Sequence, residues 1–230
     1  MDFATFTHLT FDCYGTLIDW ETGILAAVTP ILARHGVVAD AETILQLYVK
    51  YEAQQEAGSY KPYREVLQGV MAGMASELGF TPTVSELQSL PDSVGRWPSF
   101  ADTVAALTRL QTRYKLAIVS NIDDAMFAAT NILLQVEFEH IITAQQVRSY
   151  KPAPRHFQVA LERLGVPQQH VLHVAQSLYH DHVPARALGL TTVWVQRPSR
   201  LAGTGLALPA QTVPDLAVPD LQSLIDMMGL

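Results

Sequence analysis

The sequence predicts an α/β fold in which helices cover both faces of a parallel sheet. Short apolar runs rich in β-branched residues recur along the second half of the chain, and amphipathic stretches separate them. Strands and helices that alternate in this way are typical of βαβ units, whose crossovers make the strands parallel. A long helical interval after the first apolar run adds an inserted α-helical cap domain. The expected architecture is therefore a Rossmann-like sheet of about five or more strands with a helical insertion.

Five apolar runs are short enough to be buried strands and are followed by turns or helices. They are Phe6–Phe11, Lys115–Val119, Glu139–Thr143, His170–Val174 and Thr191–Val195. Amphipathic stretches before and between the later runs have the spacing of helices. They are Ala101–Arg113, Asp123–Leu134, Arg155–Leu164 and Asp181–Leu188.

The interval from Ile18 to about Pro98 contains no clear strand and is too long for a βαβ crossover, which needs only about a dozen residues. Its helical stretches are Gly23–His35, Ala41–Glu56 and Tyr63–Leu78. We therefore expect a core domain formed by residues 1–17 and 98–230 and a helical cap domain formed by residues 18–97. The proline-spaced tail from Leu208 to Pro219 is expected to be a surface linker before a final short helix.

Composition and charge exclude several classes of function. Of the 230 residues, 49% are hydrophobic, which is enough to bury a substantial core. The formal net charge is −7 and no run of Lys or Arg could follow a phosphate backbone, so nucleic acid is not an expected partner. A single cysteine, Cys13, excludes an internal disulfide. Neither a signal peptide nor the roughly 18 apolar residues of a membrane span is found, so a cytoplasmic location without membrane association is expected.

Polar side chains follow four of the expected strands. In chain order they are Asp12 with Thr16, Ser120 with Asn121, Lys151, and Asp181. Because the carboxyl ends of parallel strands open onto one crevice, these residues are expected to converge on a single site. A carboxylate such as Asp12, at the end of a buried strand and beside a tight glycine turn, is placed to attack a substrate.

Each of these residues also has a purely structural interpretation. Ser120, Asn121 and Asp181 could each cap a following helix, and Lys151 could be a solvated loop residue. Their order along the chain, at the ends of consecutive strands, favours function. The histidines on either side of Asp181 suggest a metal cluster, but adjacent residues rarely chelate one ion together and no third ligand is suitably spaced.

Four motifs, FDCYGTL, VSN, SYKPAP and HVAQSLYHD, make nearly the whole chain similar to the haloacid dehalogenase superfamily. The form Asp-x-Tyr-Gly-Thr-Leu resembles its L-2-haloacid dehalogenase (type II) branch. The resemblance implies that Asp12 attacks the halogen-bearing carbon of a small (S)-2-haloacid and that water then cleaves the aspartyl ester to give the (R)-2-hydroxy acid. The catalytic residues that it implies are Asp12, Thr16, Ser120, Lys151 and Asp181. Lys151 would keep Asp12 ionised, and Asp181 would orient Lys151 or the water.

The resemblance also implies a set of substrate-binding residues. Tyr14 would form part of the apolar wall and Asn121 would bind the substrate carboxylate. The branch usually has Ser-x-Asn before the final Asp, where this chain has Ala-Gln-Ser, so Ser177 is expected to replace the Asn. A cap arginine of the branch has no clear match, and Lys50 or Arg64 is expected to serve instead. The partner implied is a small carboxylate, and a homodimer is also expected because dimers are common in the family.

Tyr14 separates this branch from the phosphatases of the superfamily. Phosphatases carry a second Asp at this position to protonate an alkoxide, whereas halide is so weak a base that it needs no proton. They also use magnesium, which requires several oxygen ligands, and only Asp12 and Asp181 are obvious here. We therefore expect no cofactor, with Mg²⁺ needed only if the protein is a phosphatase. The alternatives are opening of a strained cyclic amino acid, a magnesium-dependent small-molecule phosphatase and, least favoured, a non-catalytic binding module.

Overall fold

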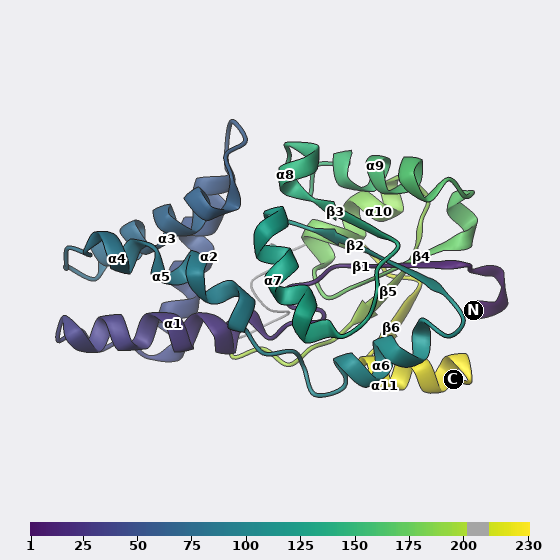
Figure 1. The fold of residues 1–230 in the computed structure, drawn as a ribbon, viewed down its shortest axis with the longest axis horizontal. Helices are drawn as coiled ribbons and strands as arrows, with labels where there is room; N and C mark the ends of the chain where they lie inside the picture. The colour runs from purple at the N-terminus through teal and green to yellow at the C-terminus, as the bar shows by residue number, and fades with distance from the viewer. Residues whose placement is uncertain (202–211) are drawn as a thin grey trace.

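A six-stranded parallel sheet forms the core of the protein in the computed structural model, which describes residues 1–201 and 212–230. The strand order is β3-β2-β1-β4-β5-β6, and every neighbouring pair is parallel (Figure 1). The strands are β1 His8–Phe11, β2 Lys115–Ser120, β3 His140–Thr143, β4 Val171–Ala175, β5 Thr191–Val195 and β6 Leu216–Val218. The predicted parallel α/β architecture is therefore confirmed.

Helices pack on both faces of this sheet, as predicted, because successive side chains of a strand point to opposite faces. In β2, Leu116 and Ile118 join the apolar cluster that includes side chains of α6, α7 and α11. Ala117 and Val119 instead join the cluster that includes side chains of α9 and α10. The helices of the core are α6 Thr103–Leu110, α7 Asp124–Leu134, α8 Ala144–Val147, α9 Arg155–Leu164, α10 Val183–Ala187 and α11 Leu221–Met228.

Five further helices, here called the helical insertion, lie between β1 and α6 in the chain and to one side of the sheet (Figure 1). They are α1 Trp20–Arg34, α2 Ala41–Glu56, α3 Tyr63–Glu77, α4 Val84–Leu87 and α5 Ser89–Ser93. Local capping explains where the first two begin, since Asp19 accepts a hydrogen bond from Thr22 N and Asp40 from Thr43 N. No helix among the described residues is long and apolar enough to cross a membrane.

Two segments connect the helical insertion to the sheet, and they run side by side. Ile18 and Ser99 form an antiparallel bridge, and Asp19 N donates to Pro98 O at 2.8 Å. A core carboxylate also caps an insertion helix, because Asp123 accepts hydrogen bonds from the first two amides of α3, each at 2.9 Å. The helical insertion is therefore held to the core at two places, the bridge between Ile18 and Ser99 and the start of α3.

The prediction of a linker from Leu208 to Pro219 was wrong where β6 forms. Residues 208–211 of that stretch lie outside the described residues, but Leu216–Val218 pair with β5 as the edge strand. Pro214 and Pro219 flank this short strand rather than interrupt it, which is where an edge strand accommodates proline. The predicted final helix is confirmed as α11.

Gly23 of α1 lies close to Trp97, in the segment that leads back to the sheet, and this contact gives a test of the packing. A Cβ added to Gly23 would lie 2.2 Å from Cγ of Trp97, which is 2% exposed. Overpacking of this kind costs about 1–3 kcal/mol, more than the roughly 1 kcal/mol that Ala gains over Gly in a helix. We expect Gly23→Ala to lower the free energy of unfolding in urea by about 1–2 kcal/mol.

Gly69→Ala is the matched control on α3, because the atoms nearest to a Cβ there belong to the flexible side chain of Gln55, which can move. Its free energy of unfolding should change by less than about 1 kcal/mol. Equal losses in both variants would contradict the assignment of the effect to Trp97.

Candidate active site

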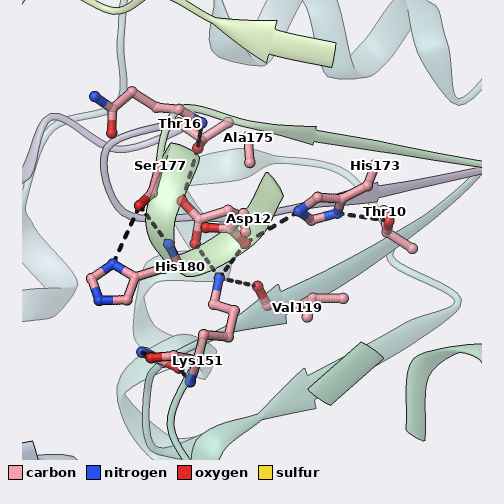
Figure 2. A network of polar contacts seen from close by, with 12 residues as sticks. Thr10, Asp12, Thr16, Val119, Lys151, His173, Ala175, Ser177 and His180 are labelled. Atoms are coloured by element: carbon pink, nitrogen blue, oxygen red, sulfur yellow. Dashed lines mark hydrogen bonds and ion pairs between the residues drawn. The ribbon is translucent and has the colours of Figure 1, made fainter. Parts of the chain in front are cut away.

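Asp12 lies directly after β1 in a tight turn that aims its carboxylate into a pocket. The turn is closed by hydrogen bonds from the amides of Leu17 and Ile18 to Cys13 O, at 2.7 and 3.0 Å. Gly15 adopts a positive φ of 96°, which a residue without Cβ tolerates best. Asp12 Oδ2 accepts from Thr16 Oγ1 at 2.8 Å, and Oδ1 accepts from Lys151 Nζ at 2.9 Å (Figure 2). Both oxygens of this buried carboxylate are therefore held in place.

Lys151 is the centre of the network in Figure 2 and is 2% exposed. Its Nζ donates to Asp12 Oδ1, to Val119 O at 2.9 Å and to Asp181 Oδ1 at 2.6 Å. These bonds use all three ammonium donors. Asn121 fixes the backbone of the lysine, accepting from Lys151 N at 2.8 Å and donating to Lys151 O at 3.2 Å.

Asp181 lies in a π-helical turn, Leu178–His182, that follows β4 and precedes α10. Its Oδ1 also contacts His173 Nε2 at 3.2 Å, and His173 Nδ1 contacts Thr10 Oγ1 at 2.9 Å. Asp181 Oδ2 is buried and has no hydrogen-bond partner among the described residues. The carboxylate is thus held through Oδ1, while Oδ2 has no partner among the described residues.

The charges in this network determine which groups are ionised. Burial would lower the pKa of Lys151, but Asp12 and Asp181 hold the pKa of this ammonium above its usual value. Burial would likewise raise the pKa of Asp181, but Lys151 and His173 hold it well below its usual range. Burial, together with the charge of Asp181, raises the pKa of Asp12, and Lys151 and Thr16 only partly offset this. One ammonium therefore faces two carboxylates, and Asp181 is the more readily ionised of the two.

The pocket beside Asp12 has a volume of about 310 Å³, enough for a small molecule. Its floor comes from the ends of the strands, and its walls come from the helical insertion and from the two connecting segments. Tyr14 lies in the wall, where its ring packs edge-on against Trp97 at 5.7 Å between centroids. Burial raises the pKa of Tyr14 well above its usual value, and its hydroxyl pairs with Thr130 Oγ1 at 2.9 Å.

The structure brings most of the residues predicted for this site to the pocket. Those that line it are Asp12, Tyr14, Lys50, Ser120, Asn121, Lys151, Ser177 and Asp181. Thr16 lies beneath the pocket against Asp12. Ser120 is 1% exposed, and its hydroxyl has no partner among the described residues. Ser177 Oγ accepts from His180 N at 3.1 Å and so caps the π-helical turn.

The two cations predicted to bind the substrate carboxylate are engaged elsewhere. Arg64 does not line the pocket, and its guanidinium instead bonds Asp92 Oδ1 at 2.7 Å and Gln88 Oε1 at 3.2 Å. The prediction for Arg64 is corrected on this ground. Lys50 lines the pocket, but its ammonium pairs with Glu77 Oε2 at 2.5 Å.

Several pocket residues were not identified from the sequence. Tyr48, Glu52 and Glu56 line the pocket from α2, where their spacing of four places them on one face of the helix. That spacing was visible in the sequence, but nothing in it showed that this face meets the end of β1. Arg197, after β5, also lines the pocket, and its Nε donates to Thr16 O at 2.9 Å.

The site offers few ligands for a divalent metal. In the described parts of the chain, no group of three or more His, Cys, Asp or Glu side chains is placed to hold an ion. The two carboxylates of the site, Asp12 and Asp181, already share one ammonium. This donor set does not fit Mg²⁺, which requires near-octahedral oxygen ligation.

The chain is similar in sequence to known proteins. A family model described as haloacid dehalogenase-like hydrolase matches residues 6–189. The chain is 24% identical over 215 residues to an (S)-2-haloacid dehalogenase of Pseudomonas fluorescens, covering 90% of this chain and 92% of that protein.

Solved structures of L-2-haloacid dehalogenases share the fold. One from Xanthobacter autotrophicus, with chloropropionic acid covalently bound, has a TM-score of 0.82 at 24% identity and covers 97% of this chain and 98% of its own. A defluorinating L-2-haloacid dehalogenase has a TM-score of 0.84 at 22% identity and covers 98% of this chain and 96% of its own. Since the family model spans most of its length, the chain belongs to the haloacid dehalogenase-like hydrolases.

Proposed function

We propose that this hydrolase removes halide from a small (S)-2-haloacid and releases the (R)-2-hydroxy acid, with Asp12 as the nucleophile. The observation that carries the proposal is the fixed carboxylate of Asp12 at the pocket, with Thr16 at 2.8 Å and Lys151 at 2.9 Å. A nucleophile held in one orientation reacts faster because the entropy cost of orienting it has already been met in the folded protein. The names of the relatives, among them (S)-2-haloacid dehalogenase, support this substrate class.

In the first step, one oxygen of Asp12 forms a bond to the carbon that bears the halogen. The carbon–halogen bond breaks with inversion, and halide leaves with the electron pair. The oxygen that does not react keeps its hydrogen bond from either Lys151 or Thr16. These donors are placed to stabilise the oxyanion when the ester is later attacked.

In the second step, water attacks the carbonyl carbon of the aspartyl ester. Asp181 Oδ2, which has no partner among the described residues, is the proposed acceptor of the water proton. The bond between the ester carbonyl carbon and the alkyl oxygen then breaks, and that oxygen takes back the proton held by Asp181 as the hydroxy acid leaves. Asp12 loses the second proton of the water to solvent and is regenerated as a carboxylate. Ser120, with its unpaired hydroxyl, and Asn121 are proposed at the substrate carboxylate.

Loss of halide requires no proton donor and no metal, which matches the residues at this site. A phosphatase would need a general acid where Tyr14 lies. The raised pKa of the Tyr14 hydroxyl makes it a poor proton donor near neutral pH, and the hydroxyl is already paired with Thr130. We propose a metal-free reaction, with the helical insertion acting as a cap over Asp12.

A second candidate is the opening of a strained cyclic amino acid by the same nucleophile. The observation that favours it is the pair of carboxyl groups, Glu52 and Glu56, in the pocket wall. A cyclic amino acid carries an ammonium that these groups could bind.

Halide release from the two enantiomers of 2-chloropropionate, measured with and without EDTA, tests the proposal. We expect release from the S enantiomer alone, at a rate that EDTA does not change. The R enantiomer is the internal control, because it presents the same atoms with the halogen turned away from Asp12. No halide release from either enantiomer, or a requirement for Mg²⁺, would contradict the proposed reaction.

A further inference from the structure

Two residues that line the pocket each carry an N–H donor without a hydrogen-bond partner in the described part of the chain. The first is Arg197, whose side chain is 5% exposed. Its Nε donates to Thr16 O at 2.9 Å and its Nη1 to both oxygens of Asp102, at 2.8 and 2.9 Å. Its Nη2 is buried and has no partner. A buried, unsatisfied donor on a cation is costly, so Nη2 indicates a place for a ligand anion.

The second donor is the indole N–H of Trp20, the first residue of α1. The chain has three tryptophans, and the indoles of Trp97 and Trp194 each donate this hydrogen to an oxygen of the protein at 2.8 Å. Trp20 Nε1 has no such partner among the described residues. It lies 3.1 Å from the position that a Cβ on Gly15 would occupy. The indole donor therefore adjoins the turn that carries Asp12.

These donors and the residue proposed for the substrate carboxylate approach Asp12 from different strands. Ser120 ends β2, whereas Arg197 follows β5, and the sheet order places β1 and β4 between them. A haloacid has one carboxylate and releases a second anion when its carbon–halogen bond breaks. The pocket thus offers a separate set of donors for each of the two anions.

The other lysines of the pocket are less suited to a buried anion. Lys151 uses all three of its donors on oxygens of the protein. Lys50 is 47% exposed at its side chain and pairs with Glu77. Among the described Lys and Arg side chains that line the pocket, Arg197 is therefore the buried one with an open donor.

The carboxyl groups of the pocket leave room for an anion at these donors. Burial raises the pKa of Glu52, and raises that of Glu56 well above its usual value, which favours their neutral forms. Asp19 and Glu21 remain near Trp20, but each accepts hydrogen bonds from other residues of the chain. Their charge is thus partly offset within the protein.

We propose that Arg197 Nη2 and Trp20 Nε1 bind the halide that leaves in the first step. As the carbon forms its bond to Asp12, the carbon–halogen bond breaks and both of its electrons go to the halide. Two donors that are already fixed stabilise the charge that develops on it. No proton is transferred, because halide is a very weak base. The inference rests on the proposed function for the source of the halide, and it assigns the recognition of the halogen to α1 and the segment after β5.

Chloride binding, followed by the width of the ³⁵Cl signal in NMR spectra, tests this site without turnover. Bound chloride tumbles with the protein, so a specific site broadens the signal in a way that saturates and that bromide reverses. We expect this behaviour from the wild-type protein. Trp20→Phe removes one donor and Arg197→Gln removes the charge, and each should weaken chloride binding by about tenfold.

Propionate separates a halide site from a carboxylate site. It is 2-chloropropionate without the chlorine, so its carboxylate can bind on the Ser120 side while the position of the halogen stays open. We expect propionate to leave the chloride signal unchanged. Displacement of chloride by propionate would mean that Arg197 binds the carboxylate and would overturn the inference.

Trp194→Phe is the matched control, because its indole N–H already donates to Gln176 O, and it should leave chloride binding unchanged. Trp20→Phe breaks no hydrogen bond to a described residue, so it remains informative if Arg197→Gln fails to fold. Broadening that does not saturate, or that both pocket variants retain, would also overturn the inference. Halide release from 2-chloropropionate without saturable chloride binding would reject the halide site but leave the proposed reaction intact. Saturable binding without turnover would reject the reaction and support the anion site.

Discussion

Asp12→Asn is expected to abolish turnover while leaving the fold intact. An amide is not a nucleophile at saturated carbon, and loss of a nucleophile lowers kcat by about 10⁴-fold or more. Asn keeps the size of the side chain and an oxygen that can accept from Lys151, so the buried site still packs. The measurement is kcat for release of halide or hydroxy acid. Asp40→Asn, an exposed helix cap where Asn is equally suitable, is the control and should retain full activity.

A single turnover in ¹⁸O-water distinguishes the proposed mechanism from direct attack by water. If Asp12 attacks the substrate, the hydroxyl oxygen of the first product molecule comes from the protein. The solvent label should then appear in the peptide that contains Asp12. Label found directly in the hydroxy acid, with none in that peptide, would mean that Asp12 acts as a base and not as the nucleophile.

Lys151→Met is expected to have the largest effect on stability. It leaves two buried carboxylates, Asp12 and Asp181, without their cation, and loss of one partner from a buried pair costs about 3–5 kcal/mol. We expect the free energy of unfolding at pH 7 to fall by about that amount and activity to be lost. Lys115→Met is the control, because its side chain is 62% exposed and surface pairs contribute less than about 1 kcal/mol.

The pH dependence of this deficit identifies its cause. Without Lys151, burial and mutual repulsion raise the pKa of both carboxyl groups in the folded protein above that in the unfolded chain. A group with a raised folded-state pKa favours the fold when protonated and opposes it as the pH rises through that pKa. The deficit of the variant, measured by urea unfolding, should therefore be larger at pH 7 than at pH 4.5. An equal deficit at both pH values would indicate lost packing of the lysine chain instead.

The convergence of Asp12, Ser120, Lys151 and Asp181 could be predicted from the sequence because it depends only on topology. Each lies at or after the carboxyl end of a strand of a parallel sheet, and such ends meet at one edge. The local sequence pattern was also sufficient to locate α2 and α9, and the structure confirms the predicted bounds of both helices. These features need no knowledge of how distant segments dock.

The pocket wall depends on such docking and was largely missed. Lys50 or Arg64 was expected to serve as the cap cation that binds the substrate, but their partners Glu77 and Asp92 lie 27 and 28 positions further along the chain. No local pattern reports an ion pair across that separation. Glu52 was not identified for a similar reason, since its burial depends on the rotation of α2 against the strand ends.

The pairing of Ile18 with Ser99 makes the helical insertion a replaceable module. A chain that leaves the sheet and returns at adjacent points can lose, gain or exchange everything between them without breaking a core strand. Asp12, Lys151 and Asp181 all lie outside the exchanged segment, whereas Glu52 and Glu56 lie inside it. A relative with a different insertion would therefore bind different substrates but keep the residues that break the bond. Substrate range and reaction type can then evolve at different rates.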